Sequence, residues 1–461
     1  MHRSGFMLNG AFFEISTLYK NMNNLKPKKS QAKNSSKQKN MPKPGKLSGK
    51  IRNLFSKIGP GLVTGASDDD PSGIVTYSQA GAQMGLSTLW TALITFPLMA
   101  AIQGMCARIG LVTSQGLAET IKQNYPKPIL YIILLFSLPA ITLNIGADIQ
   151  AMGAVAHMIL PLIPASIYSV VITVVLIFVI IKYPYQKIAT FLKWLCFSLL
   201  LYIIVPFTIK LDWTLIAKHT FIPTIQFNKE FLSILVAILG TTISPYLFFW
   251  QATMESEDVE TGSKNVIVNK RVLNEMKTDV NLGMLLSNVV MFFIILTTGS
   301  VLFAAGIHKI DTVEQAAQAL EPLTGKLTYL IFAIGVLGTG LLAIPVLAGA
   351  QSYMLAETFG WKTGLDKKFT KAKEFYISII LSIIVGLSLE FFGVSPIKSL
   401  IYTAILYGLI APVLIALILH IGNNKKIMKK NTNSMLSNTL GFLSLIVMTV
   451  AAFGLIYFLV V

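Results

Sequence analysis

Long apolar runs recur along the chain and are separated by shorter polar segments. Each run holds roughly 18 to 25 residues, so that one helix can cross the roughly 30 Å of hydrocarbon in a bilayer. The pattern predicts eleven membrane-spanning helices, at about 54–80, 86–107, 128–160, 165–181, 189–209, 230–254, 280–306, 326–356, 375–393, 396–420 and 437–460. Composition agrees with this pattern, because 54% of the residues are hydrophobic and only 13% are charged. We therefore expect an all-α integral membrane protein.

Two of the predicted spans contain polar residues and helix breakers. The first includes "GASDDDPSG", where Asp68–Asp70 precede Pro71, and the sixth includes "GTTISPYLFFW", where Pro245 follows two threonines and a serine. A span tolerates such residues only where the freed backbone groups line a cavity or meet protein partners. We expect each of these two spans to break into two half-helices.

The two breaks fall in the first and sixth spans, which cross the membrane in opposite directions. This arrangement predicts two inverted five-helix repeats, at 51–210 and 229–421, followed by an extra helix at 437–461. Secondary transporters built this way bind their substrate between the broken helices, near the middle of the membrane. The sequence therefore favours a transporter.

Lys and Arg are unevenly distributed among the polar segments. Thirteen of the 38 lie in the first 57 residues, nineteen lie in alternate loops that would share their side of the membrane, and six lie in the opposite loops. Since cytoplasmic loops carry the excess of these residues, the N-terminus is expected in the cytoplasm. We expect a multi-pass protein of the plasma or inner membrane, and the net charge of +17 then needs no nucleic-acid partner.

Residues 1–50 form a basic segment rich in Lys, Ser, Asn and Pro, which we expect to be a disordered cytoplasmic tail. Two interpretations of its charge stay open. It can bind anionic lipid headgroups, or it can act only as a determinant of topology. The protein is expected to be a monomer without a cofactor.

An ionised carboxylate inside a membrane is costly unless it is paired or solvated, so such acids mark functional sites. Asp70 is the strongest candidate, because it comes directly before Pro71 at the predicted break. A carboxylate beside exposed backbone carbonyls suits a hard divalent cation. Asp68 and Asp69 can equally cap a half-helix, since Asp is a preferred N-cap residue.

The sixth span offers the hydroxyls and carbonyls of Thr241, Thr242 and Ser244. These residues can bind an ion, or they can satisfy backbone groups as Ser and Thr often do in membrane helices. Asp148, in "NIGADIQAMG" of the third span, is another lone acid. It can relay protons, or it can be a structural hydrogen-bonding residue.

Three stretches of the chain resemble the Nramp (natural resistance-associated macrophage protein) family of divalent-metal transporters. They are "GPGLVTGASDDDPSGIVTYSQAGAQMGLSTLW" at 59–90, "ARIGLVTSQGLAETI" at 107–121 and "GTTISPYLFFWQA" at 240–252. The resemblance implies a LeuT-type fold and a divalent cation, as substrate, bound between the two breaks. It also implies that the Asp70 carboxylate and the Thr241 carbonyl are ligands.

Two departures from the family change the expected ion. Gly73 stands where the family has Asn, and Ser244 stands where it has Met. Loss of the thioether removes the donor that favours soft transition metals over alkaline-earth ions. Mg²⁺ keeps several waters when bound, and a roomier site with Asp69 nearby suits a partly hydrated ion. The same two substitutions resemble those of the Nramp-related magnesium transporters, and this resemblance implies Mg²⁺ as the expected substrate.

Proton coupling is also affected by departures from the family. Tyr246 and Gln251 stand where the family has histidines in the sixth span, and Asp148 and Ala151 stand where it has an acidic pair. The resemblance thus makes Asp148, Tyr246 and Gln251 candidates for an ion or proton pathway. Because most of these titratable groups are missing, we expect transport without proton coupling. The alternative is a proton-coupled Mn²⁺ or Fe²⁺ transporter. More remote alternatives are a cation channel and an intramembrane aspartyl protease using Asp70 and Asp148.

Overall fold

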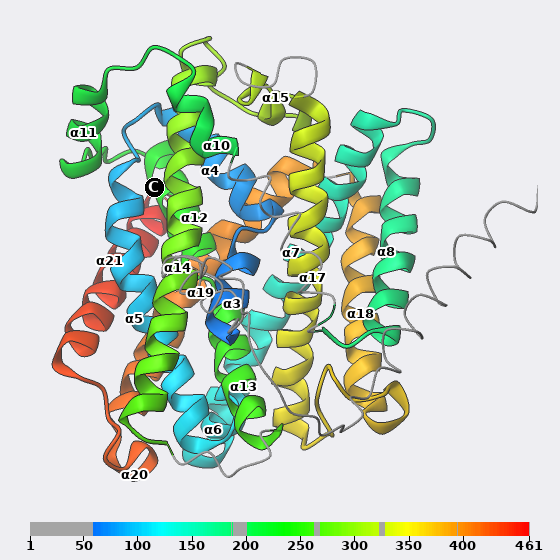
Figure 1. Cartoon of the computed structure of the whole chain (residues 1–461), viewed down its shortest axis with the longest axis vertical. Coiled ribbons are helices and arrows are strands. Elements are labelled where there is room, and N and C mark those ends of the chain that lie inside the picture. The colour runs from blue at the N-terminus through cyan, green and yellow to red at the C-terminus, as the bar shows by residue number, and fades with distance from the viewer. Residues whose placement is uncertain are drawn as a thin grey trace, which may run out of the picture. The chain divides into compact units, whose positions relative to one another are not determined.

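The computed structural model describes residues 59–185, 187, 201–261, 268–321, 328–393 and 395–460. Within these ranges the regular elements are helices (Figure 1). The longer helices are α5 (Trp90–Thr113), α7 (Lys127–Ile159), α8 (Ala165–Lys182), α14 (Lys270–Thr298), α17 (Thr328–Phe359), α18 (Lys373–Ser388), α19 (Pro396–Asn423) and α21 (Met435–Val460). The paired half-helices are α3 (Pro60–Asp68) with α4 (Pro71–Met84), and α12 (Lys229–Thr242) with α13 (Pro245–Thr261). The prediction of an all-α fold is confirmed.

Nine of the described helices or helix pairs are long and apolar enough to cross a membrane. They match nine of the eleven predicted spans. The predicted first span is divided into α3 and α4, and neither half reaches that length alone. Most of the predicted fifth span, 189–209, lies outside the described residues, and its described end forms α10 (Leu201–Ile204) and η2 (Val205–Phe207). The predicted tail, 1–50, also lies outside them.

Several predicted boundaries are wrong, including the end of the sixth span, predicted at 254, because α13 runs to Thr261. The seventh span begins at Lys270 rather than at 280, because the side chain of Asn269 caps α14 and Arg271 pairs with Glu275 one turn later. These polar turns continue the helix beyond its apolar part, which is all that hydropathy detects. The second span, predicted at 86–107, runs as α5 from Trp90 to Thr113.

Short helices in the connections were not predicted. They are α6 (Leu117–Asn124), α11 (Trp213–Phe221), α15 (Val313–Gln318), η5 (Phe369–Lys371) and α20 (Lys425–Met428). The short turns η3 (Gly299–Phe303) and η6 (Leu389–Phe392) lie at the ends of the predicted spans 280–306 and 375–393. Figure 1 shows α11 and α15 at one end of the helical bundle and α6 and α20 at the opposite end. The basic loops that were predicted to be cytoplasmic include those that carry α6 and α20.

Both predicted helix breaks are present. Asp69 and Asp70 separate α3 from α4, and Ile243 and Ser244 separate α12 from α13. Each second half-helix starts with a proline, whose missing N–H and fixed φ suit the first helical position but not a helix interior. The prolines therefore suit the start of each second half-helix, although proline alone does not end a helix here, since Pro97 lies inside α5.

Close helix packing brings the two broken helices into the interior. A Cβ atom at Gly65 of α3 would lie 2.3 Å from the carbonyl oxygen of Gly283 on α14, so only glycine allows this approach. Small residues of this kind let membrane helices pack backbone to backbone. The other half-helix, α4, packs against α7, α12, α14 and α19. The breaks are thus enclosed by helices from distant parts of the chain.

Candidate functional site

Asp70 lies at the first break as the N-cap residue of α4. Its Oδ1 accepts a hydrogen bond from the Gly73 amide at 2.7 Å, and its Oδ2 accepts one from the Asn144 side chain of α7 at 3.1 Å. The capping role considered for this acidic run therefore includes Asp70 itself. A carboxylate has about four lone-pair positions, so these two hydrogen bonds leave capacity for a cation.

Asp68 and Asp69 turn toward α14, where both contact Ser287. The Ser287 hydroxyl lies 2.6 Å from Asp68 Oδ2 and 3.2 Å from Asp69 Oδ1. A hydroxyl has a single proton, so it donates to one carboxylate at a time. Two buried carboxylates that share one donor repel each other unless a cation or proton lies near them. Electrostatics therefore favours positive charge at this end of α3.

The second break contains no charged side chain. The Ser244 hydroxyl donates to the Thr241 carbonyl at 2.5 Å, and the Thr242 hydroxyl donates to the Ile238 carbonyl at 2.7 Å. Both hydroxyl protons thus satisfy carbonyls at the end of α12, as the backbone interpretation of these residues predicts. The Thr242 oxygen lies 3.1 Å from the Tyr77 hydroxyl of α4, which can donate to it. The Ser244 oxygen and the second lone pair of the Thr241 carbonyl keep acceptor capacity.

Tyr246 and Gln251 join α13 to α3. The Tyr246 hydroxyl donates to the Ser67 carbonyl at 3.1 Å, and the Thr64 hydroxyl donates to Gln251 Oε1 at 2.6 Å. Gln251 also donates to Glu255 at 3.0 Å. Neutral hydrogen bonds therefore connect α13, which follows the second break, to α3, which precedes the first break. The prediction that these two residues lie on an ion or proton pathway stays a prediction.

Asp148 is fully buried on α7, four residues after Asn144. Within the described residues neither of its carboxylate oxygens has a hydrogen-bond partner, and the same holds for Asp68 Oδ1, Asn144 Oδ1 and the Tyr407 hydroxyl. Asp148 and Tyr407 both lie within electrostatic range of Asp70. Buried polar atoms are almost always bonded to protein, water or an ion. The surroundings of Asp70 are therefore rich in oxygen atoms with free acceptor capacity.

Asn144 and Ser287 were missed by the sequence analysis. Asn144 had a detectable signal, because it lies one helical turn before Asp148 and so shares its face of α7. Ser287 had none, since a single serine in an apolar run is common in membrane helices. Across the described ranges no three His, Cys, Asp or Glu side chains are grouped in a way that could hold a metal.

A second polar cluster lies at the end of the bundle that carries α6. Glu357 of α17 accepts hydrogen bonds from the Glu119 amide at 3.1 Å and from the Thr253 hydroxyl at 2.8 Å. Its own carbonyl accepts one from Lys122 at 3.0 Å. A single acidic residue thus connects α17, α6 and α13, and the sequence analysis did not single it out.

Comparison with known proteins now adds to this geometry. The sequence pattern of the family described as natural resistance-associated macrophage protein-like (Nramp) matches residues 61–458, which is most of the chain. The chain belongs to the Nramp family. The recognition made from three short motifs is thereby confirmed.

Relatives within the Nramp family are distant in sequence but match over most of their length. The Divalent metal cation transporter MntH of Caldanaerobacter subterraneus subsp. tengcongensis is 23% identical over 400 residues, which cover 85% of this chain and 90% of the relative. The protein of the same name from Clostridium acetobutylicum is 25% identical over 397 residues, covering 85% and 88%.

Solved structures show the same fold. The Eremococcus coleocola manganese transporter, in complex with an aromatic bis-isothiourea substituted compound, matches with a TM-score of 0.69 at 17% identity, over 91% of this chain and 88% of that one. Mhp1, a nucleobase-cation-symport-1 family transporter, matches with a TM-score of 0.54 at 12% identity, over 87% and 91%. The LeuT-type fold predicted for this Nramp family member, with its first and sixth helices broken, is confirmed.

Proposed function

We propose that this Nramp family member transports divalent metal cations, and that Mg²⁺ is its principal substrate. The names of its relatives support divalent metal cations as the substrate class. In this proposal the ion binds between the two broken helices, and opposite sides of the bundle open in turn. The acids Asp69 and Asp70 supply charge, and the Thr241 carbonyl supplies a neutral oxygen.

The observation that carries the preference for Mg²⁺ is the donor set at the two breaks. Carboxylate, carbonyl and hydroxyl oxygens surround this place, and hard cations prefer such oxygens. A Cβ atom at Gly73 would lie 3.6 Å from Asp70 Oδ1 and 3.2 Å from the Asp68 carbonyl oxygen. Position 73 therefore faces the Asp70 carboxylate, and a side chain there would crowd the Asp68 carbonyl and the Tyr77 ring, whose Cε2 would lie 3.4 Å from the Cβ atom. Glycine keeps the approach to Asp70 free of an amide ligand.

One observation favours Mn²⁺ or Fe²⁺ as a second candidate. Met291 of α14 is fully buried, and its sulfur lies 3.6 Å from the Thr242 hydroxyl oxygen at the second break. A thioether favours softer metals. The Met291 sulfur also lies 3.9 Å from the Thr95 hydroxyl, however, so it already has two hydroxyl neighbours. We rank this candidate second for that reason.

Transport without proton coupling is part of the proposal. Tyr246 and Gln251 are neutral, and both are engaged in hydrogen bonds to α3. Of the titratable groups that the family pattern led us to expect there, Asp148 is the one that this chain keeps. In proteoliposomes, Mg²⁺ uptake should leave the internal pH unchanged. Internal acidification that follows Mg²⁺ uptake and disappears in Asp148→Asn would contradict uncoupled transport.

We further propose that the chain acts as a monomer in the plasma or inner membrane, with its N-terminus in the cytoplasm. The distribution of Lys and Arg supports this orientation. The transporter names of the relatives argue against both an intramembrane protease and a channel. Saturable flux at low turnover is expected, whereas single-channel currents would contradict a carrier.

The test of the proposed substrate is ion flux into proteoliposomes for Mg²⁺, Mn²⁺ and Ca²⁺, with wild type beside Asp70→Ala. We expect saturable Mg²⁺ flux that Asp70→Ala abolishes. Competition separates the two candidates. Uptake of micromolar Mn²⁺ should be suppressed by millimolar Mg²⁺, and Mn²⁺ uptake that persists under this competition would favour the second candidate.

A further inference from the structure

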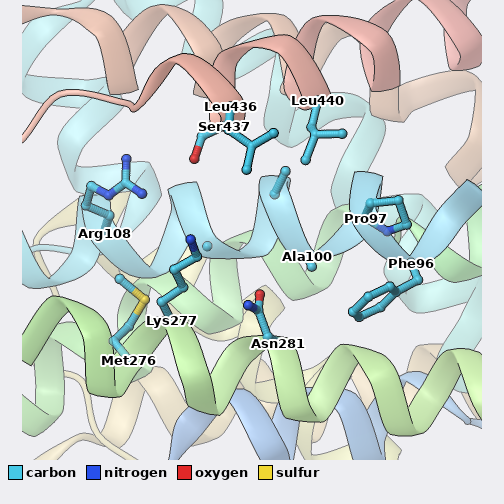
Figure 2. A pocket seen from close by; sticks show the side chains of 12 residues that line it. Phe96, Pro97, Ala100, Arg108, Met276, Lys277, Asn281, Leu436, Ser437 and Leu440 are labelled. Atoms are coloured by element: carbon cyan, nitrogen blue, oxygen red, sulfur yellow. The ribbon is translucent and has the colours of Figure 1, made fainter.

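An open groove lies on the outside of the bundle, away from the broken helices. It is formed by α5, α14 and α21 and has a volume of about 200 Å³. Pockets that enclose drug-sized ligands usually measure about 300–1,000 Å³, so this groove holds part of a molecule rather than all of one. Figure 2 shows Phe96 and Pro97 at one end of it and Arg108 and Lys277 toward the other.

The walls of the groove are mainly apolar. Phe96 and Ala100 come from α5, and Leu436 and Leu440 come from α21. Gly104 also lines the groove, one helical turn after Ala100 on α5, and a Cβ atom built there would meet no atom within 4 Å. Many other glycines of this bundle are in close contact with a neighbouring backbone. Gly104 instead borders open space, which can take an apolar chain.

Arg108 and Lys277 are the two basic residues of the groove. Within the described residues neither has a carboxylate partner, because the ion pairs found there involve other side chains. Arg108 is partly buried and donates one hydrogen bond to Asn433 at 3.1 Å. Its guanidinium has five N–H donors, so most of them stay available. Lys277 is exposed. The groove therefore has a positive end with free donors.

The acids nearest to Lys277 along α14 are engaged elsewhere. Glu275 pairs with Arg271 at 3.1 Å. Asp279 accepts a hydrogen bond from the Gly61 amide at 2.6 Å, on the side of α14 that faces α3. Neither acid neutralises the positive end of the groove. An anion there would meet Arg108 and Lys277 together.

The length of the groove matches one leaflet of a bilayer. Phe96 and Arg108 are twelve residues apart on α5, which corresponds to about 18 Å along a helix. Half of the hydrocarbon thickness is about 15 Å. Arg108 and Lys277 also lie in or next to loops that the charge distribution predicts to be cytoplasmic. Anionic lipids are concentrated in the cytoplasmic leaflet of the membrane.

We propose that this groove binds an anionic phospholipid of the cytoplasmic leaflet. One acyl chain lies along Gly104 toward Phe96, and the headgroup phosphate lies between Arg108 and Lys277. A phosphodiester offers the oxygen acceptors that a guanidinium and an ammonium recognise. The site is formed by residues of α5, α14 and α21 and does not depend on which ion the protein transports.

The experiment measures lipid retention by the full chain with native mass spectrometry, and thermal unfolding with added lipid. The probes are phosphatidylglycerol and phosphatidylcholine with the same acyl chains, and glycerol phosphate as a headgroup without chains. Wild type should retain phosphatidylglycerol preferentially and unfold at a higher temperature in its presence. Equal retention of both lipids, or the same stabilisation by glycerol phosphate, would overturn the proposal.

Variants separate the two parts of the site. Lys277→Gln and Arg108→Gln should each weaken phosphatidylglycerol binding roughly fivefold, whereas Lys182→Gln, an exposed basic residue at the end of α8, should bind like wild type. Gly104→Phe should displace both lipids, and Gly104→Ala should not. Unchanged binding in Lys277→Gln, which removes no hydrogen bond, would overturn the headgroup assignment. Unchanged binding in Gly104→Phe would overturn the acyl-chain assignment.

Discussion

The two broken helices differ in charge and in the way their polar groups are satisfied. The first break has three consecutive acids, and the hydrogen bonds to them come partly from other helices, from Asn144 on α7 and Ser287 on α14. The second break is neutral, and the hydroxyls of Thr242 and Ser244 donate to carbonyls of their own helix. The acids of the first break therefore depend on donors from distant helices. At the second break the hydroxyl protons stay within the same segment, and the Tyr77 hydroxyl of α4 lies 3.1 Å from the Thr242 oxygen.

This difference assigns different roles to the two breaks. The first break supplies the negative charge that attracts a cation, and the second break supplies neutral oxygen atoms. Changes at the first break, or in the helices that hold its acids, should therefore have larger effects on ion affinity than changes at the second. The predictions below follow that order.

Removing the Asp70 side chain should have the largest effect. Asp70→Ala takes away a proposed ligand and also the N-cap of α4, since its Oδ1 accepts the Gly73 amide. We expect Mg²⁺ flux at background level and a loss of about 1 kcal/mol in the free energy of unfolding. Flux assays and denaturation of the purified variant measure the two effects. Wild-type flux would refute the assigned site.

Asn144→Ala should have the next largest effect, because Asn144 holds Asp70 through a hydrogen bond of 3.1 Å. Loss of a side chain that orients a metal ligand usually lowers affinity about 10- to 100-fold. We expect the KM for Mg²⁺ to rise by about tenfold or more. Thr142→Ala, on the same helix, is the control, since Thr142 bonds Gln351 and not the acids. Equal KM values for the two variants would contradict a positioning role.

Restoring the residues usual in the family should change selectivity more than overall activity. Gly73→Asn adds an amide beside Asp70, and Ser244→Met adds a thioether at the second break. We expect Mn²⁺ and Cd²⁺ flux to rise relative to Mg²⁺ flux, most of all in the double variant. Flux ratios in proteoliposomes measure this shift. An unchanged ratio would mean that neither position faces the ion.

Thr241→Val should have the smallest effect, because the proposed ligand at this position is a backbone carbonyl that the substitution keeps. We expect the Mg²⁺ KM to stay within about twofold of wild type, since the substitution removes only the hydroxyl and keeps the carbonyl acceptor. A tenfold rise in KM would show that the second break contributes a side-chain ligand and would remove the contrast between the two breaks.

Much of the fold follows from local properties of the sequence. Apolar length predicts the spans, and Pro71 and Pro245 mark the breaks because each follows a run of polar residues. Proline alone is not sufficient, since Pro97 and Pro139 lie inside continuous helices. The polar start of α14 escaped prediction, since its turns are held by the Asn269 cap and the pair of Arg271 and Glu275 rather than by apolar residues.

The candidate site was predictable only where chemistry is concentrated in adjacent residues. Three acids before a proline stand out in an apolar run, and so does Asp148. Ser287 and Tyr407 become part of the site only through packing of α14 and α19 beside α4, which depends on contacts between residues far apart in the chain. Hydrogen bonds across helices of this kind leave no pattern in a single sequence.

The central claim is that the charge of Asp70 binds the transported cation and that its capping of α4 is a separate role. Asp70→Asn separates the two, because Asn is an equally good N-cap but lacks the negative charge. The most direct measurement is Mg²⁺ flux together with thermal unfolding for this variant beside wild type. We predict unfolding close to that of wild type, with Mg²⁺ flux at background. Mg²⁺ flux equal to that of wild type would contradict the claim.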